Sequence, residues 1–322
     1  MISKIIIFVI FHIFLIFSLE SKPSKAQTWV RVGYFKHKQD FSISEIDSSL
    51  FTHLICGFAD LDSTTYQLSL PYDDKNYFSI FTKTVKQKNP SVTTLLSIGG
   101  PDFYSMVSNS SYRKSFIDSS IKIARLYSFQ GLDFFAIALE ARNSSQQQQL
   151  ILTAAVKYSP NNYSVSYPIE SIHQYLNWVH VLPIDLSTLT PYESTDFTAA
   201  TNPLYNPARF PANKLVMSLT YYGFACMLVN SNKNGIGAPA NCITSSPDFK
   251  TYKEIKERCG AKVSYNETYV VNYCTFGRNW ISFDDVDAVR TKISYAKKRG
   301  LLGYSVLQVS YDDNCILSQA AG

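Results

Sequence analysis

The sequence predicts an α/β protein built on a (β/α)8 barrel, the TIM-type fold, with an α+β subdomain inserted between the seventh and eighth strands. Eight short apolar segments alternate with stretches of amphipathic helix pattern, as expected for parallel strands buried on both faces. Residues 224–281 interrupt this alternation with turn-rich and alternating segments. The chain of 322 residues is long enough for one such barrel. An open doubly wound sheet is the alternative that the pattern leaves open.

The strand candidates are short and apolar, and most are rich in β-branched or aromatic residues. Ser111 is expected to cap the helix that follows the third strand, because apolar residues recur after it at helical spacing. A second helix is predicted over 284–299, with Gly300 just beyond its C-terminus. In chain order the strands are predicted at 30–34, 52–58, 92–98, 132–136, 150–156, 178–184, 215–221 and 302–306.

The N-terminal residues 1–26 have the features of a secretory signal peptide. An apolar run follows Lys4, and Ser24-Lys-Ala26 has the small-x-small pattern of a cleavage site. We therefore expect a mature chain, 27–322, that begins at Gln27 and is extracellular, in the apoplast or cell wall, with the vacuole as an alternative. An uncleaved membrane anchor is the other interpretation. Sequons that secretion would expose to glycosylation begin at Asn109, Asn143, Asn162 and Asn266.

Six cysteines are compatible with disulfides in a secreted protein. Four of them lie in the predicted insertion, which suggests a disulfide-braced subdomain, but their spacing does not give the pairing. A zinc site is disfavoured because the sequence has no CxxC or HxxxH spacing. The cysteines are Cys56, Cys226, Cys242, Cys259, Cys274 and Cys315.

The charge distribution argues against nucleic-acid binding. The net charge is +5 with 17% charged residues, and no block of lysine and arginine occurs. We expect a monomer that needs no metal or cofactor and does not bind membranes after signal cleavage.

Seven segments of the sequence form a set of motifs: Phe51-Thr-His-Leu-Ile-Cys-Gly-Phe-Ala-Asp-Leu-Asp62, Leu95-Leu-Ser-Ile-Gly-Gly100, Arg113-Lys-Ser-Phe-Ile-Asp-Ser-Ser-Ile-Lys122, Gly131-Leu-Asp133, Asn272-Tyr-Cys274, Tyr295-Ala-Lys-Lys-Arg-Gly-Leu-Leu-Gly-Tyr304 and Asp312-Asp-Asn314. Together they resemble the plant class V chitinases of glycoside hydrolase family 18. The resemblance covers nearly all of the mature chain. It implies the barrel, the insertion, and a binding site for β-1,4-linked N-acetylglucosamine, as in chitin and chito-oligosaccharides.

The same resemblance places the family's catalytic Asp-x-Asp-x-Glu motif on the fourth strand. In that family the Glu protonates the glycosidic oxygen, and the acetamido group of the sugar attacks the anomeric carbon. Here the first Asp is Asp133, whereas Phe135 takes the place of the second and Ile137 the place of the acid. Both catalytic carboxyl groups are therefore missing.

Glu140 is a poor replacement for the acid. It lies seven residues after Asp133, an odd offset that turns its side chain to the opposite face of a continued strand. We expect Glu140 to begin the crossover to the fifth strand. That crossover has only about 13 residues, close to the minimum for such a connection.

Of the other positions in the implied sugar site, some are altered and some are retained. Leu307 stands where the family has a Trp beneath the sugar, and Cys226 stands where it has an aromatic residue. Packing is the alternative role for the retained aromatic residues, and hydrogen bonding within the barrel is the alternative for the two aspartates. The predicted substrate-binding residues are Tyr34, Phe58, Asp133, Asp185, Tyr221 and Tyr222.

These observations favour a secreted chitinase-like protein that binds chito-oligosaccharide without hydrolysing it. One alternative is an active glycosidase, with Glu140 as its acid or with an intact motif hidden by a gene-model error at the short crossover. The other is a secreted protein-interaction partner, or a paralogue without function.

Overall fold

The structure is a computed structural model that describes residues 28–37, 40–71, 75–99, 106, 109–135, 150–157, 169–182, 211–242, 248–260 and 262–322. The predicted signal peptide lies outside these residues, as do Ile137, Glu140 and Asp185.

Eight parallel strands close into a barrel, which confirms the predicted fold class and all eight predicted strands. The ring closes because β1 pairs on one side with β15 and on the other with β2. Observed strand ends differ from the predicted ones by a few residues. The order around the barrel is β1 (Val30–Lys36), β15 (Gly303–Leu307), β8 (Leu215–Thr220), β7 (Trp178–Leu182), β6 (Ile151–Lys157), β5 (Gly131–Phe135), β4 (Thr93–Ile98) and β2 (His53–Leu61).

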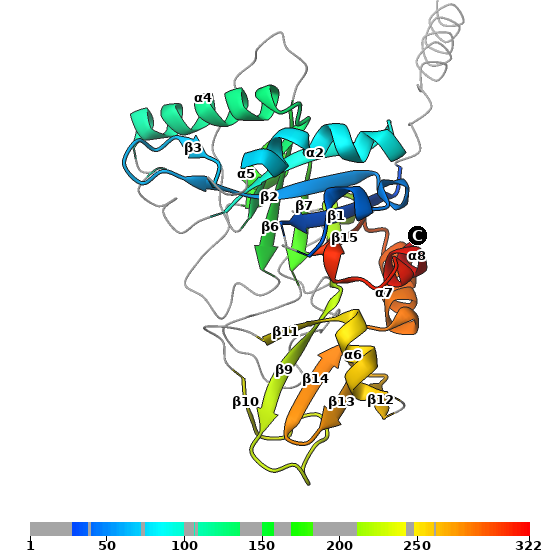
Figure 1. The fold of residues 1–322 in the computed structure, drawn as a ribbon. Coiled ribbons are helices and arrows are strands. Elements are labelled where there is room, and N and C mark those ends of the chain that lie inside the picture. The colour runs from blue at the N-terminus through cyan, green and yellow to red at the C-terminus, as the bar shows by residue number, and fades with distance from the viewer. Residues whose placement is uncertain are drawn as a thin grey trace, which may run out of the picture.

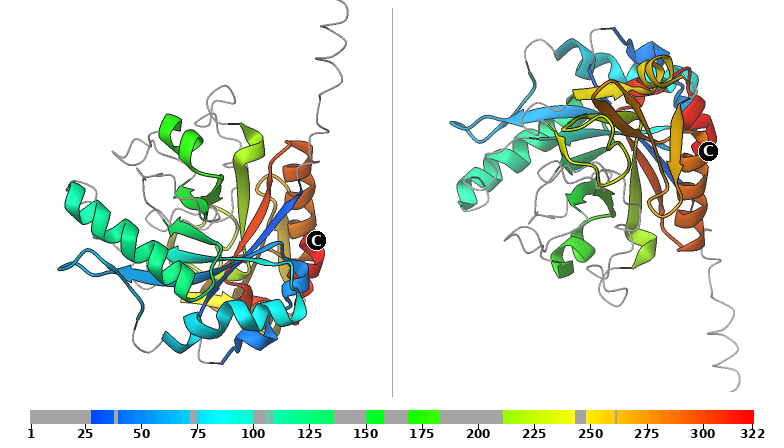
Figure 2. Two further views of the ribbon diagram at one scale, coloured as in Figure 1. Left: turned by 90° about the horizontal axis from the view of Figure 1, so that it is seen from above. Right: turned by 90° about the horizontal axis from the view of Figure 1, so that it is seen from below.

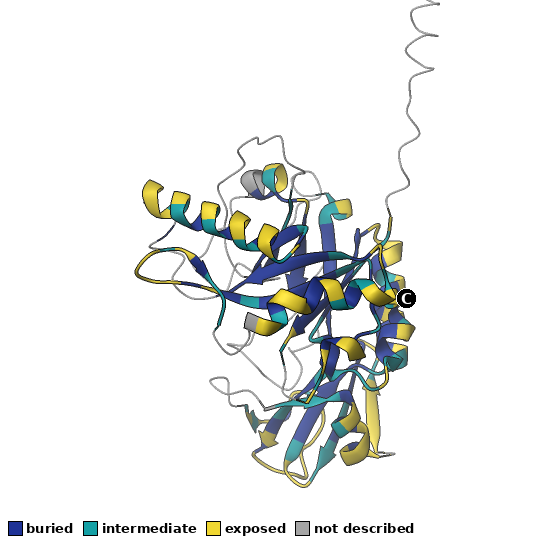
Figure 3. Cartoon of the chain, turned by 45° about the horizontal axis from the view of Figure 1, so that its top comes forward, coloured by how far each residue is buried: buried dark blue, intermediate teal, exposed yellow. Residues whose placement is uncertain are grey.

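Helices flank the barrel, and α4 and α7 lie on opposite sides of it (Figure 2). The strands are largely buried and the outward surfaces of the helices are exposed (Figure 3). Within the described residues, no helix combines the length and apolar character that a membrane span requires. The helices are α2 (Lys75–Lys88), α4 (Ser110–Leu126), α5 (Ile169–Tyr175), α7 (Val286–Lys298) and α8 (Ile316–Ala321), with 3-10 turns η1 (Ile43–Glu45), η2 (Ser48–Leu50), η6 (Ala212–Lys214) and η7 (Val309–Tyr311).

The helix ends show one wrong prediction and one correct one. Asn109, not Ser111, caps α4. Its Oδ1 accepts hydrogen bonds from the backbone N of Ser111 at 2.9 Å and from the Ser111 hydroxyl at 2.7 Å. An Asn side chain at this position satisfies an amide of the first turn. At the other helix, Gly300 follows α7 with φ 67°, the left-handed backbone that favours glycine after a helix.

Between β8 and α7, the described part of the chain forms a second, six-stranded sheet with one helix, at the end of the barrel that is lowest in Figure 1. It runs from Tyr222 to Phe283, slightly beyond the predicted 224–281 at each end. A short strand, β3 (Leu68–Ser69), pairs separately with β2. The inserted elements are β9 (Tyr222–Leu228), β10 (Ala240–Asn241), β11 (Asp248–Thr251), α6 (Tyr252–Cys259), β12 (Val263–Asn266), β13 (Val271–Phe276) and β14 (Asn279–Phe283).

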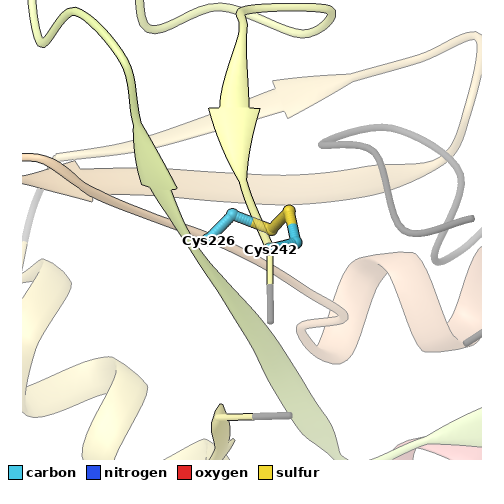
Figure 4. The surroundings of a disulfide bond; sticks show 2 residues. All are labelled: Cys226 and Cys242. Atoms are coloured by element: carbon cyan, nitrogen blue, oxygen red, sulfur yellow. A yellow bond between two sulfur atoms is a disulfide. The ribbon is translucent and has the colours of Figure 1, made fainter. Parts of the chain in front are cut away.

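Two disulfides brace this insertion. Cys226 on β9 is bonded to Cys242, just after β10 (Figure 4). Cys259, at the end of α6, is bonded to Cys274 on β13. A buried ion pair then joins the insertion to the barrel: both carboxylate oxygens of Asp284, which follows β14, lie 2.7 Å from Nζ of Lys292 on α7.

Candidate functional site

The first candidate residue, Asp133, lies in a row of polar side chains across three neighbouring barrel strands. The register pairs Ser97 of β4 with Asp133 of β5, and Asp133 with Thr153 of β6. Paired residues in a sheet point to the same face, so all three side chains meet in one layer. The three are fully buried. A polar cluster in such a place requires that its members satisfy one another.

Three hydroxyl groups donate hydrogen bonds to the Asp133 carboxylate. Thr153 Oγ1 donates to Oδ1 at 2.6 Å, while Ser97 Oγ and the Tyr34 hydroxyl donate to Oδ2 at 2.8 and 3.0 Å. Burial raises the pKa of Asp133, and the three hydrogen bonds oppose that rise without cancelling it. Burial, followed by the neighbouring Asp133, also raises the pKa of Tyr34, so its hydroxyl keeps its proton and remains a donor.

His180 on β7 lies beside this carboxyl group but forms no ion pair with it. Its Nε2 is 3.7 Å from Asp133 Oδ1 and 3.1 Å from Trp178 Nε1. An indole N–H can only donate, so Nε2 of His180 must be the acceptor and the ring must be neutral. Burial, and then the nearby His53, lowers the pKa of His180 to about 3. This agrees with a neutral imidazole at physiological pH.

This arrangement supports the barrel. Among the described residues, the influences on the pKa of Asp133 are burial and three hydroxyl groups, with no second carboxyl group. Phe135 ends β5 and pairs with Ala155, so the strand does continue to the position of the family's second Asp. Ile137 and Glu140 lie outside the described residues. Asp133 is thus a buried acceptor that joins β1, β4, β5 and β6.

The other predicted binding residues fall into two groups. Tyr34 and Tyr221 are buried, with exposed fractions of 4% and 1%. A sugar could not reach either ring in this arrangement. Tyr34 is held by packing and by its hydrogen bond to Asp133, and Tyr221 by packing in the core. Phe58 and Tyr222 are half-buried and present some ring surface. Phe58 lies at an irregularity in β2 against Gly99, where an added Cβ would come within 3.3 Å of its ring.

The structure adds two aromatic residues that the sequence analysis did not identify. Phe249 on β11 and Tyr311 in η7 both contact Tyr222 edge-on, with ring centroids 4.6 and 5.9 Å from it. Leu307, at the end of β15, packs with Tyr222 and Phe249 against the buried Phe224 and Cys226. No local signal marked Phe249, because its importance comes from pairing with β9 across the insertion.

No cluster of three or more histidine, cysteine, aspartate or glutamate side chains suitable for a metal ion occurs in the described ranges.

The residues of the Asp133 cluster that the sequence analysis missed, namely Ser97, Thr153 and His180, share one signal. Each is a single polar residue with apolar residues on both sides in the chain, as in Leu95-Leu-Ser-Ile98 and Ile151-Leu-Thr-Ala154.

Several known proteins are similar to this chain in sequence and in fold. A class V chitinase of Arabidopsis thaliana is 40% identical over 355 aligned positions, which cover 95% of this chain and 92% of that protein. A class V chitinase of Nicotiana tobaccum, solved as a mutant in complex with NAG4, is 36% identical with a TM-score of 0.81, over 91% of this chain and 97% of that one. A chitinase-like agglutinin of Robinia pseudoacacia is 35% identical with a TM-score of 0.77, over 90% and 98%.

The sequence model of the glycosyl hydrolases family 18 matches residues 30–312. This range begins at the first residue of β1 and ends beyond η7, so it takes in the whole barrel and the inserted sheet. The chain therefore belongs to glycosyl hydrolase family 18 and is a chitinase-like member of it, similar to the plant class V chitinases.

Proposed function

We propose that this chain binds chito-oligosaccharides and does not hydrolyse them. Binding is supported by membership of the family, by a relative solved with NAG4, and by a relative described as an agglutinin. Half-buried aromatic rings at the barrel mouth offer the apolar surface that carbohydrate sites use.

One observation carries the proposed lack of hydrolysis. The Asp133 carboxylate is fully buried and engaged by three hydroxyl groups, while the next two carboxyl positions of the motif are Phe135 and Ile137. Glycoside hydrolysis needs a protonated acid at the leaving oxygen, and general acid–base catalysis contributes roughly 10²–10⁴-fold to such rates. Asp133, fully buried and accepting hydrogen bonds at both oxygens, does not serve as that acid in this proposal.

Calorimetry and a turnover assay on the same preparation test both parts. Titration with chitotetraose and chitohexaose is expected to give heat. A fluorogenic chitotrioside is expected to release no fluorophore above a Glu140→Gln control. If neither oligosaccharide gives heat, the proposed binding function is refuted. Fluorophore release that Glu140→Gln abolishes would establish an active enzyme that uses an unexpected acid.

An engineered restoration tests whether chemistry alone was lost. Phe135→Asp combined with Ile137→Glu is expected to give no substantial hydrolysis, because Leu307 also departs from the family pattern and transition-state contacts act as a unit. Hydrolysis at a substantial rate would show that the rest of the site is intact.

A second candidate, an active chitinase, is favoured by the length of one connection. Between β5 and β6 lie 15 residues, 136–150, whereas 32 residues, 99–130, connect β4 to β5. The Arabidopsis relative aligns over 355 positions, more than the 322 residues of this chain, so it carries residues with no counterpart here. Sequencing the transcript across codons 132–150 decides the matter. An additional in-frame segment with two carboxyl residues after Asp133 would favour the enzyme.

Secretion, glycosylation and a monomeric state complete the proposal. Asn109 is exposed, and it caps α4 through Oδ1 and not through Nδ2, the atom to which a glycan is attached. Expression of the full sequence in plant cells, followed by mass spectrometry, is expected to find an apoplastic chain that begins at Gln27 and carries a glycan at Asn109. Retention of residues 1–26 would support the membrane-anchor interpretation instead. Light scattering is expected to give the mass of one chain.

A further inference from the structure

The family resemblance implies an aromatic floor beneath the sugar at the end of the eighth barrel strand, and this chain has Leu307 there. A leucine side chain cannot offer the flat ring surface on which a pyranose rests. If the chain binds chito-oligosaccharide as proposed above, another side chain must provide that surface. The residues that pack together with Leu307 are the first place to look.

Leu307 belongs to an apolar cluster with Tyr222 and Phe249 at the C-terminal mouth of the barrel, and Tyr311 contacts Tyr222. Tyr222 follows the end of β8, and Tyr311 lies just after β15, so both project from the end of a barrel where (β/α)8 proteins place their sites. Phe249 comes from the insertion, and its ring lies 4.6 Å from Tyr222 at an interplanar angle of 60°. Leu307 packs against the same buried residues, Phe224 and Cys226.

The backbone fixes the position of Phe249. It pairs with Phe224 in the antiparallel ladder between β11 and β9, and the two rings are 5.7 Å apart at 70°. The Cys226–Cys242 disulfide joins the same strand, β9, to the chain beyond β10, within the same apolar cluster. Phe249 is therefore held by a paired strand and not by a free loop, yet it remains half-buried.

Burial separates this ring from the other aromatic residues near the barrel. Tyr34 and Tyr221 are buried and Tyr304 is fully so, which leaves their rings no surface for a ligand. Phe249, Tyr222 and Tyr311 are all half-buried, as expected for rings with one side packed and another exposed. Each edge-to-face contact covers a face of only one of its two rings, whereas a stacked pair covers one face of both.

We propose that Phe249, supported by Tyr222, supplies the aromatic surface for an N-acetylglucosamine ring, in place of the strand-eight aromatic residue that Leu307 replaces. The aromatic surface is thus supplied by the inserted sheet, whereas in the family pattern a barrel strand supplies it. Sugar affinity in this chain consequently depends on β11, and a leucine at 307 is compatible with binding. The inference rests on the proposed chito-oligosaccharide binding and adds the residue responsible for it.

Calorimetry with chitotetraose on the full mature chain tests the inference. Phe249→Leu keeps apolar bulk and removes the ring, and we expect it to weaken binding about tenfold, while Phe249→Tyr retains affinity. The matched control is Tyr265→Leu, which removes a 48% exposed aromatic ring from β12 of the same sheet, outside the cluster. Leu307→Trp added to Phe249→Leu is expected to recover affinity.

The outcomes separate the two proposals. No heat with the wild-type chain would overturn the proposed function, and this inference with it. Wild-type binding that Phe249→Leu leaves unchanged would overturn the inference alone. Hydroxyl-radical footprinting of the wild-type chain requires no variant to fold: chitotetraose should protect the peptide containing Phe249 and leave the Tyr265 peptide unchanged. Protection absent at Phe249 under saturating sugar would also refute it.

Discussion

Replacement of His180 should make the stability of this protein less sensitive to acid. Burial lowers the pKa of His180 to about 3, and that of His53, on β2 at the opposite side of the barrel from β7, to about 4. In an unfolded chain both imidazoles would titrate near the usual value of about 6.5. As the pH falls below that value, the unfolded state binds protons that the folded state does not bind.

The sign and size follow from linkage. The two histidines favour the folded state fully above about pH 6.5, and this contribution is lost as the pH falls toward the folded-state pKa values. Each histidine contributes up to about 1.4 kcal/mol per pH unit. Over the interval from about pH 6.5 to about pH 4, His180 alone should cost the wild type roughly 3 kcal/mol. The raised pKa of Asp133 acts in the opposite direction, so the total slope is smaller.

A comparison of variants isolates the histidine. In His180→Gln the side-chain oxygen can still accept the Trp178 N–H bond, but the side chain cannot take up a proton. Urea unfolding, followed by tryptophan fluorescence from about pH 7 to about pH 4.5, should show a flatter loss of unfolding free energy than in the wild type. Gln174→Ala, an exposed change on α5 that involves no titratable group, should leave the slope as it is. Parallel slopes for His180→Gln and the wild type would contradict the reasoning.

Three further changes should alter stability. Lys292→Met leaves the buried Asp284 carboxylate without its cation, so the free energy of unfolding should fall by about 3–5 kcal/mol; a loss below about 1 kcal/mol in urea titrations would argue against a buried charge. Cys226→Ala with Cys242→Ala removes the cross-link that closes a loop of sequence separation 16, so the free energy of unfolding should fall by about 3 kcal/mol; a melting temperature equal to that of the wild type would contradict this. Gly303→Ala places a Cβ against the main-chain oxygen of β1, so calorimetry should show a loss of about 1–3 kcal/mol or more; an unchanged transition would refute the clash.

The barrel was predictable because its strands are buried on both faces and so appear as separate apolar runs. Strand ends and caps were less predictable. Asn109, Ser110 and Ser111 are all good capping residues, and only the backbone geometry shows that α4 begins after Asn109. The short strands β10 and β11 were missed because partners far along the chain, on β9, determine them.

The sequence identified Asp133 but not the side chains that hold it. A lone serine or threonine in an apolar strand gives no indication of its neighbour, because the neighbour depends on the register between strands. Once the barrel forms, that register places Ser97 and Thr153 beside Asp133. The same limit explains the disulfides, since cysteine spacing was compatible with several pairings and the fold selects two.

The intact hydrogen bonds of Asp133 do not by themselves argue for an active enzyme. Tyr34, Ser97 and Thr153 lie on three strands of the barrel, and with Asp133 they connect β1, β4, β5 and β6. Removal of Asp133 would leave three buried hydroxyl groups without their acceptor, at about 1–3 kcal/mol each. Stability alone is thus reason enough to keep it, whether or not a sugar is cleaved. Catalysis depends instead on the residues that follow along the chain, where the sequence has Phe135 and Ile137, and on whether the transcript supplies others in their place.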